Sequence, residues 1–382
     1  MLAHRAFDGQ RWLSDAAVLI RGERIVGVAP WGEVPPAWPQ TRLPDGIFLA
    51  PGFIDLQVNG GGGVLLNDAP TADAMRAIAR AHRRFGTTAC LPTLITDRRE
   101  KMGAAIAAAR TIAGRDGVLG LHLEGPFISP KRPGVHRGDL IRQPDTGDVD
   151  ELHDLAGAGR SLVTLAPECV PPGFVRTFAA SGIRISIGHS EASADVVAQA
   201  VTDGATGVTH LFNAMPPLSA REPGIVGAAL AERRLTAGLI CDGIHVDPVS
   251  LRTAFAAKGF DRVALVTDAM PTVGTSLDQF ELMGRTVRRT DGRLTTQAGT
   301  LAGAHLDMAA AVRNAVALAG VSLEDALRAA SLTPARFLGL EHERGVLVPG
   351  ARADLVAMTD DLRVVVTWLG GESDAGVSGA PQ

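Results

Sequence analysis

Short runs of β-branched and other apolar residues recur roughly every 20 to 40 residues through the middle of the chain. Alanine-rich segments with helical spacing fill most of the intervals between them. Eight apolar strands that alternate with helices predict a closed (β/α)8 TIM-like barrel, with a doubly wound parallel sheet as the alternative. The eight runs are residues 47–58, 87–94, 117–125, 161–168, 183–190, 207–214, 236–246 and 262–270.

The two ends of the chain alternate with a period of two instead. Residues 11–46 are typical of a β-hairpin, and residues 345–371 show the same alternation. Because an isolated hairpin is only marginally stable, we expect the two ends to pair in one small β-sandwich domain beside the barrel. The predicted division is residues 1–49 plus 345–382 for this discontinuous β domain and residues 50–344 for the barrel.

Composition narrows the class of protein. The 382 residues are 46% hydrophobic and 20% charged, which suits a globular chain with a large core. The net charge of −4 argues against a nucleic-acid partner. No apolar run reaches the length of about 18 residues that a membrane helix needs, and the start lacks the apolar block of a signal peptide. The sequence therefore predicts a cytoplasmic protein with neither a nucleic-acid nor a membrane partner.

Polar residues gather where the apolar strands end. In a (β/α)8 barrel, catalytic groups lie at the carboxyl ends of the strands. Packing alone does not require apolar strands to finish with histidine and carboxylate side chains. The sequence therefore predicts a metal site at this face of the barrel. The residues in question are Gln57, Asn59, Glu124, His189, His210, Asn213, Asp242, His245 and Asp268.

Three of these residues form a ligand set. Glu124, His189 and His210 come from three separate strand ends, and a closed barrel can point them at a common centre. Two imidazoles and one carboxylate are the ligands of an open catalytic zinc site. Asp268 is the remaining carboxylate, placed to take a proton from water and pass it to a leaving nitrogen. The alternatives are a helix N-cap for Asp268 and a buried ion pair with arginine for Glu124.

Longer motifs carry a resemblance to a known family. The segments LHLEGPFISPKRPGVH (121–136), HLFNAMPPLSAREPG (210–224) and LVTDAM (265–270) occur in the expected order, after PGFIDLQVNGGGG (51–63). The chain resembles the amidohydrolase superfamily and, within it, the N-acetylglucosamine-6-phosphate deacetylase family. The resemblance extends over nearly the whole chain.

The resemblance implies a reaction and a site. The reaction is hydrolysis of N-acetyl-D-glucosamine 6-phosphate to D-glucosamine 6-phosphate and acetate. Glu124, His189 and His210 would hold the metal, Asp268 would act as general base and then acid, and His136 would polarise the amide carbonyl. The implied substrate-binding positions are Val135, His136, Asn213, Ala214, Arg221, His245, Leu301, Ala302 and Gly303.

The same resemblance implies which residues bind the sugar phosphate and how many subunits the protein has. Arg221 and His245 match phosphate-binding positions, and a guanidinium forms paired hydrogen bonds with phosphate oxygens. In this family the phosphate arginine and a histidine can come from the neighbouring subunit. The resemblance therefore also implies a homodimer.

The first strand bears on the number of metal ions. Many amidohydrolases carry H-x-H at this point and hold two metals, whereas this chain has Gln57-Val58-Asn59. An amide is a poorer ligand than imidazole for zinc. We therefore expect one divalent metal ion per subunit. Zinc is favoured, iron, manganese and cobalt stay open, and so does a weak second site near Gln57 and Asn59.

Three other functions remain as alternatives. The first is deacetylation of another N-acetylhexosamine 6-phosphate, such as the galactosamine isomer. The second is deamination or cyclic-amide hydrolysis, against which the missing H-x-H motif argues. The third is a non-catalytic sugar-phosphate sensor, which would bind its ligand without releasing acetate.

Overall fold

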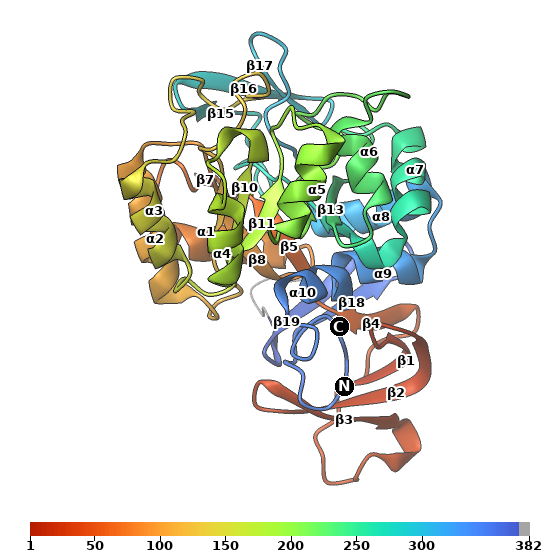
Figure 1. Cartoon of the computed structure of the whole chain (residues 1–382). Coiled ribbons are helices and arrows are strands. Elements are labelled where there is room, and N and C mark those ends of the chain that lie inside the picture. The colour runs from red at the N-terminus through yellow and green to blue at the C-terminus, as the bar shows by residue number, and fades with distance from the viewer. Residues whose placement is uncertain (374–382) are drawn as a thin grey trace.

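The computed structural model describes residues 1–373, which form a barrel with a separate sheet at one end (Figure 1). Eight parallel strands follow one another in chain order around the barrel. The backbone N–H of Asp268 donates to the carbonyl of Gln57 (3.0 Å), which brings the last strand back to the first. The predicted TIM-like barrel is confirmed. Its strands are β5 (Phe53–Val58), β8 (Thr87–Ile95), β9 (His122–Glu124), β10 (Leu162–Leu165), β11 (Arg184–Ile187), β12 (Gly207–Val208), β13 (Thr236–Ile240) and β14 (Val263–Val266).

Ten helices are present in the described residues, and most of them surround the barrel. Several begin where the side chain of a Ser, Thr or Asp accepts a hydrogen bond from a free backbone N–H of the first turn, as Thr71 does for α1 and Asp307 does for α8. They are α1 (Ala72–Arg83), α2 (Arg99–Ile112), α3 (Thr146–Leu155), α4 (Phe174–Ala180), α5 (Ala194–Thr202), α6 (Gly224–Ala231), α7 (Pro248–Lys258), α8 (Met308–Ala319), α9 (Leu323–Ala330) and α10 (Leu332–Leu338). No helix of residues 1–373 is long and apolar enough to cross a membrane.

Both ends of the chain enter one seven-stranded sheet, as expected from their alternation. The order is β20-β19-β18-β4-β1-β2-β3, with β1 and β4 parallel. A small apolar core with Leu49, Leu355 and Trp368 packs against it. The domain limits at residues 49 and 345 stay a prediction, and residues 374–382 lie outside the described part. The strands are β1 (Leu2–Phe7), β2 (Trp12–Arg21), β3 (Arg24–Pro30), β4 (Ile47–Pro51), β18 (Leu355–Thr359), β19 (Val364–Leu369) and β20 (Glu372–Ser373).

The first apolar run is divided between the two sheets. Residues 47–58 were expected to form one strand, but β4 joins the terminal sheet and β5 joins the barrel, with Gly52 between them. A Cβ at Gly52 would lie 2.2 Å from Cγ2 of Thr88. The chain therefore changes sheets at a point where its backbone packs directly against β8.

A small antiparallel sheet covers the carboxyl ends of the barrel strands, and the hydrophobic pattern did not predict it. It consists of β15 (Gln279–Leu282), β16 (Arg285–Thr290) and β17 (Arg293–Thr296), at the top of Figure 1. Its fully buried side chains Leu282, Val287 and Leu294 pack with Ile95 at the end of β8 and with Val135 and Met270 of the loops above the barrel. A two-strand ribbon, β6 (Gly60–Gly61) and β7 (Val64–Leu65), follows β5.

His82 of α1 makes the stability depend on pH. Its Nε2 donates to the carbonyl of Gly60 (2.9 Å), and burial lowers its pKa from 6.5 to about 4. Below pH 6.5 the unfolded chain therefore binds a proton that the folded chain does not. The free energy of unfolding should fall by up to about 3 kcal/mol between pH 6.5 and pH 4 from this residue. His82→Gln should flatten that slope in urea unfolding. His342→Gln, on a 94% exposed side chain, is the control, and equal slopes for both variants would contradict the prediction.

Candidate active site

Four polar side chains converge above the barrel from four different strand ends. Glu124 ends β9, whereas His189, His210 and Asp268 each lie two residues beyond the ends of β11, β12 and β14. The last three have positive φ angles of 48°, 30° and 51°. Such backbone costs about 1–3 kcal/mol per residue and clusters at functional sites. The chain therefore accepts strain at these positions, where the strand ends turn into loops.

Glu124, His189 and His210 lie within ligand distance of a common point. Nε2 of His210 is 2.9 Å from Oε1 of Glu124 and 3.0 Å from Nε2 of His189, and Nε2 of His189 is 3.3 Å from the same oxygen. Two ligands bound tetrahedrally to zinc at about 2.0–2.1 Å lie roughly 3.3 Å apart. The spacing and chemistry of these donors therefore fit a divalent metal ion.

Hydrogen bonds orient the ring of His189 and keep Glu124 ionised. Nδ1 of His189 donates to the carbonyl of Arg132 (2.8 Å), which leaves its Nε2 with a lone pair. Burial raises the pKa of Glu124, but the adjacent imidazoles of His189 and His210 outweigh this effect and hold that pKa well below its usual range. The carboxylate therefore has the charge that a metal ligand needs.

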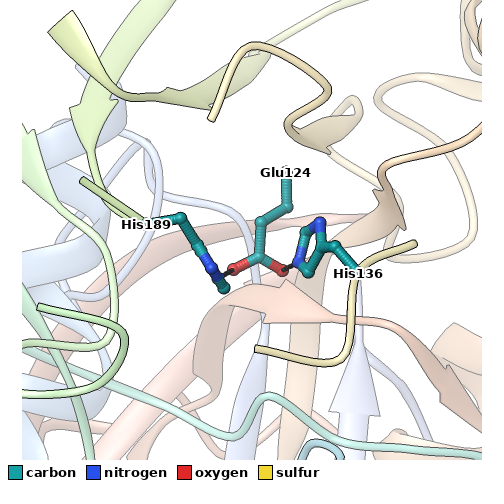
Figure 2. A group of neighbouring side chains, drawn as sticks. All are labelled: Glu124, His136 and His189. Carbon is teal, nitrogen blue, oxygen red and sulfur yellow. Dashed lines mark hydrogen bonds and ion pairs between the residues drawn. The ribbon is translucent and has the colours of Figure 1, made fainter. Parts of the chain in front are cut away.

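His136 offers a competing ligand set. Glu124, His136 and His189 present possible ligand atoms within 4.8 Å of one another (Figure 2). However, Nε2 of His136 is 4.0 Å from Glu124, farther than His210. The backbone N–H of Thr96 points at its Nδ1 (3.4 Å), so Nδ1 is the acceptor and Nε2 carries the proton. Burial lowers the pKa of His136 to about 3, which keeps the ring neutral. This tautomer favours His136 as a hydrogen-bond donor and His210 as the third ligand.

Asp268 lies beside this group and is held by two amides. Its Oδ1 accepts hydrogen bonds from Asn59 Nδ2 (2.6 Å) and Gln57 Nε2 (3.1 Å), and Gln57 Nε2 also donates to Glu124 (3.0 Å). Burial and the nearby Glu124 raise the pKa of Asp268 to about 6. Gln57 and Asn59 thus donate hydrogen bonds to carboxylates, at the positions where the histidines of an H-x-H motif would supply imidazole lone pairs.

Asp55 is a supporting residue that sequence reasoning missed. It lies on β5 and is fully buried, which raises its pKa to about 7. Its carboxyl group accepts from the Thr267 hydroxyl (2.5 Å) and the backbone N–H of Gln57 (3.1 Å). Asp55 therefore links Gln57 to Thr267, the residue that precedes Asp268. A carboxylate inside an otherwise apolar strand was the available signal.

A cavity of about 380 Å³ opens over the converging side chains. His245 lines it, and its Nδ1 contacts Asp242 (2.6 Å), so that Nε2 is the nitrogen left for a ligand. Of the predicted positions, Arg221 is exposed outside the cavity, and Ala302 is buried against the β15–β17 sheet. The predicted residues that line the cavity are Asn59, Glu124, Val135, His136, His189, His210, Asn213, Ala214, His245, Asp268, Leu301 and Gly303.

Two cations in the cavity wall were not predicted as site residues. Lys131 and Arg132 line the cavity from the loop that also carries His136. Arg132 pairs with Glu191 and accepts the His189 hydrogen bond through its carbonyl. Both residues lie within the 121–136 motif, and this position was the sequence signal that could have identified them as site residues.

Together, the closed parallel barrel and the histidine–carboxylate centre at its carboxyl end define a metal-dependent hydrolase of the barrel type. The chain belongs to the amidohydrolase family, which it matches over residues 48–373.

Individual proteins of known name are similar to this chain over most of its length. The chain is 43% identical to an N-acetylgalactosamine-6-phosphate deacetylase of Shewanella sp. (strain ANA-3), over 87% of this chain and 84% of that one. It is 35% identical to an N-acetylglucosamine-6-phosphate deacetylase of Haemophilus influenzae, over 94% of this chain and 95% of that one. The crystal structure of N-acetylglucosamine-6-phosphate deacetylase from Pasteurella multocida superposes with a TM-score of 0.92 at 36% identity, covering 97% of each chain.

Proposed function

We propose that this protein removes the acetyl group from N-acetyl-D-glucosamine 6-phosphate, giving D-glucosamine 6-phosphate and acetate. The observation that carries the proposal is the convergence of Glu124, His189 and His210 beside Asp268 in one cavity. The names of similar proteins that align over most of the chain point to the same substrate class.

Glu124, His189 and His210 would hold one divalent ion, for which zinc is the first choice. When bound, such an ion lowers the pKa of a coordinated water and polarises a carbonyl oxygen. Asp268 takes the proton of the attacking water and then gives it to the nitrogen that leaves. Burial and the nearby Glu124 raise its pKa above that of an ordinary aspartate in the metal-free chain, which favours a group that both accepts and releases a proton. Asn59 and Gln57 keep its carboxylate aimed at the cavity.

His136 would act on the acetamide carbonyl. Its Nε2–H faces the cavity from a fixed ring, because Thr96 occupies Nδ1. A donor placed where negative charge develops on oxygen contributes about 3 kcal/mol to catalysis. The sugar would be surrounded by Val135, Asn213, Ala214 and the Leu301–Gly303 stretch. Within that stretch, the buried side chain of Ala302 would anchor the backbone.

The galactosamine isomer is the second candidate substrate. The favouring observation is the 43% identity to an N-acetylgalactosamine-6-phosphate deacetylase. Acetate release should be measured on N-acetylglucosamine 6-phosphate, N-acetylgalactosamine 6-phosphate and both unphosphorylated sugars, with metal content determined on the same sample. Release from neither phosphorylated sugar, with about one ion bound per chain, would refute the proposed reaction. Two stably bound ions per chain would refute the single-metal site.

Arg221 and His245 would bind the sugar phosphate. Since Arg221 is exposed and lies outside the cavity of its own chain, we propose that it reaches the site of the second subunit of a homodimer. Arg221→Ala should raise KM for the phosphorylated sugar by about tenfold or more, because a paired guanidinium–phosphate contact is lost. KM for unphosphorylated N-acetylglucosamine should hardly change. Arg233→Ala, at an exposed arginine beyond the other end of α6, is the control. An equal rise in KM for both sugars would remove Arg221 from the phosphate site.

A further inference from the structure

A second cavity of about 300 Å³ lies at the opposite end of the barrel, among the amino ends of β11 to β14 and the helix α10. We call it the floor cavity. Arg184 begins β11, Thr206 precedes β12, and Arg336 comes from α10. Its volume is at the lower end of the range for small-molecule pockets. It shares no lining residue with the cavity that holds Glu124 and Asp268.

The floor cavity has an excess of positive charge. Four arginines and two carboxylates line it: Arg184, Arg234, Arg262, Arg336, Asp261 and Glu341. Arg234 pairs with Glu232 (2.7 Å). The other three arginines form no ion pair or side-chain hydrogen bond within residues 1–373. The four arginines outnumber the two carboxylates of the same hollow, so a bound anion would balance the remaining positive charge.

The pKa values of two basic groups at or near the floor cavity are lowered, in part by this excess of positive charge. Burial, and after it the neighbouring Arg160, lower the pKa of Arg184, and the carboxylate of Glu341 offsets only part of this effect. Lys258, whose Nζ donates only to the carbonyl of Glu232 (2.6 Å), has its pKa lowered to about 8 by burial and by Arg262. The protein therefore holds these cations together without enough carboxylates to balance them.

Two buried oxygen atoms beside the floor cavity indicate which hydrogen-bonding groups a ligand would need in addition to negative charge. Oγ1 of Thr206 and Oε2 of Glu341 are shielded from solvent and have no hydrogen-bond partner in the described residues, and both residues line the floor cavity. A buried polar atom left without a partner costs about 1–3 kcal/mol. A carboxylate oxygen accepts only, so a simple anion cannot satisfy Glu341. A ligand that also carries hydroxyl donors can, after a side-chain rotation: both oxygens are closed to solvent, and the Glu341 side chain, 34% exposed overall, is free to turn Oε2 toward the cavity.

We propose that the floor cavity binds a phosphate monoester with free hydroxyl groups, of the sugar-phosphate class, at a site separate from the metal centre. The phosphate lies among Arg184, Arg262 and Arg336. The hydroxyl groups donate to Glu341 and exchange hydrogen bonds with Thr206. This assignment holds whichever substrate the metal centre hydrolyses.

Isothermal titration of the metal-loaded chain with glucose 6-phosphate tests the proposal. The double variant Arg184→Gln/Arg336→Gln should lose one binding component of the wild type, with its affinity reduced at least tenfold, because two phosphate contacts are removed. Arg233→Gln, an exposed arginine of the same region outside the cavity, should keep it. The rate of acetate release in the absence of glucose 6-phosphate should stay within about twofold in both variants.

Two further measurements control for misfolding of the double variant and test the role of Glu341. Arg336→Glu alters one exposed side chain, so it should fold normally and also lose the component; circular dichroism and thermal unfolding verify the fold. Inorganic phosphate should bind the component more weakly than glucose 6-phosphate, because it has no sugar hydroxyl groups for Glu341. An isotherm unchanged by Arg184→Gln/Arg336→Gln and by Arg336→Glu would overturn the site. Equal affinity for the two ligands would overturn the assignment of Glu341.

Discussion

Asp268→Asn should lower kcat for acetate release by roughly two to four orders of magnitude, the usual contribution of a positioned general acid–base group. An amide cannot accept the proton of the attacking water. The substitution is nearly isosteric, and the oxygen of the new side chain can still accept the hydrogen bonds of Asn59 and Gln57. Metal content and substrate binding should therefore persist.

Stopped-flow or steady-state kinetics, with metal analysis on the same preparation, checks this expectation. Asp278→Asn is the matched control, because Asp278 lies in an exposed loop ten residues away and should leave kcat unchanged. Near-normal turnover by Asp268→Asn would refute its role as base. Loss of the metal together with activity would instead make Asp268 a ligand.

His210→Gln and His136→Gln should separate the two possible ligand sets. If Glu124, His189 and His210 hold the metal, His210→Gln should lose most of the bound ion and nearly all activity. His136→Gln should keep about one ion per chain and lose kcat by about two orders of magnitude, since it removes one donor at the carbonyl oxygen.

Metal affinity measured by competition with a chelator is the deciding quantity, because it does not depend on turnover. His342→Gln again serves as the exposed control. A chain that loses its metal in His136→Gln and retains it in His210→Gln would reverse the assignment. The tautomers fixed by Thr96 and Arg132 are the physical reason to expect the opposite.

The barrel could be predicted because its strands are buried on both sides and therefore appear as separate apolar runs. The polar residues that end these runs stand out for the same reason, which is why Glu124, His189, His210 and Asp268 could be proposed as site residues from the sequence. The switch of sheets at Gly52 was not predicted, because buried apolar residues continue on both sides of it; the Pro51-Gly52 pair was the available signal.

Other features depend on contacts that are distant in sequence. The β15–β17 sheet consists of short strands in a polar segment, and only packing against Ile95, Val135 and Met270 shows its place over the cavity. The tautomer of His136 depends on Thr96, forty residues away. The exposed position of Arg221 relative to its own cavity likewise requires the folded chain.

The seven-stranded sheet also determines where the protein can be attached to something else. Met1 and β20 both lie at the end of the molecule opposite the β15–β17 sheet (Figure 1). A carrier or solid support joined to the amino end would face away from the cavity, leaving the substrate's entrance unobstructed. Deleting β1, in contrast, would destabilise the domain. This strand lies between β4 and β2, and its loss would split the sheet in two.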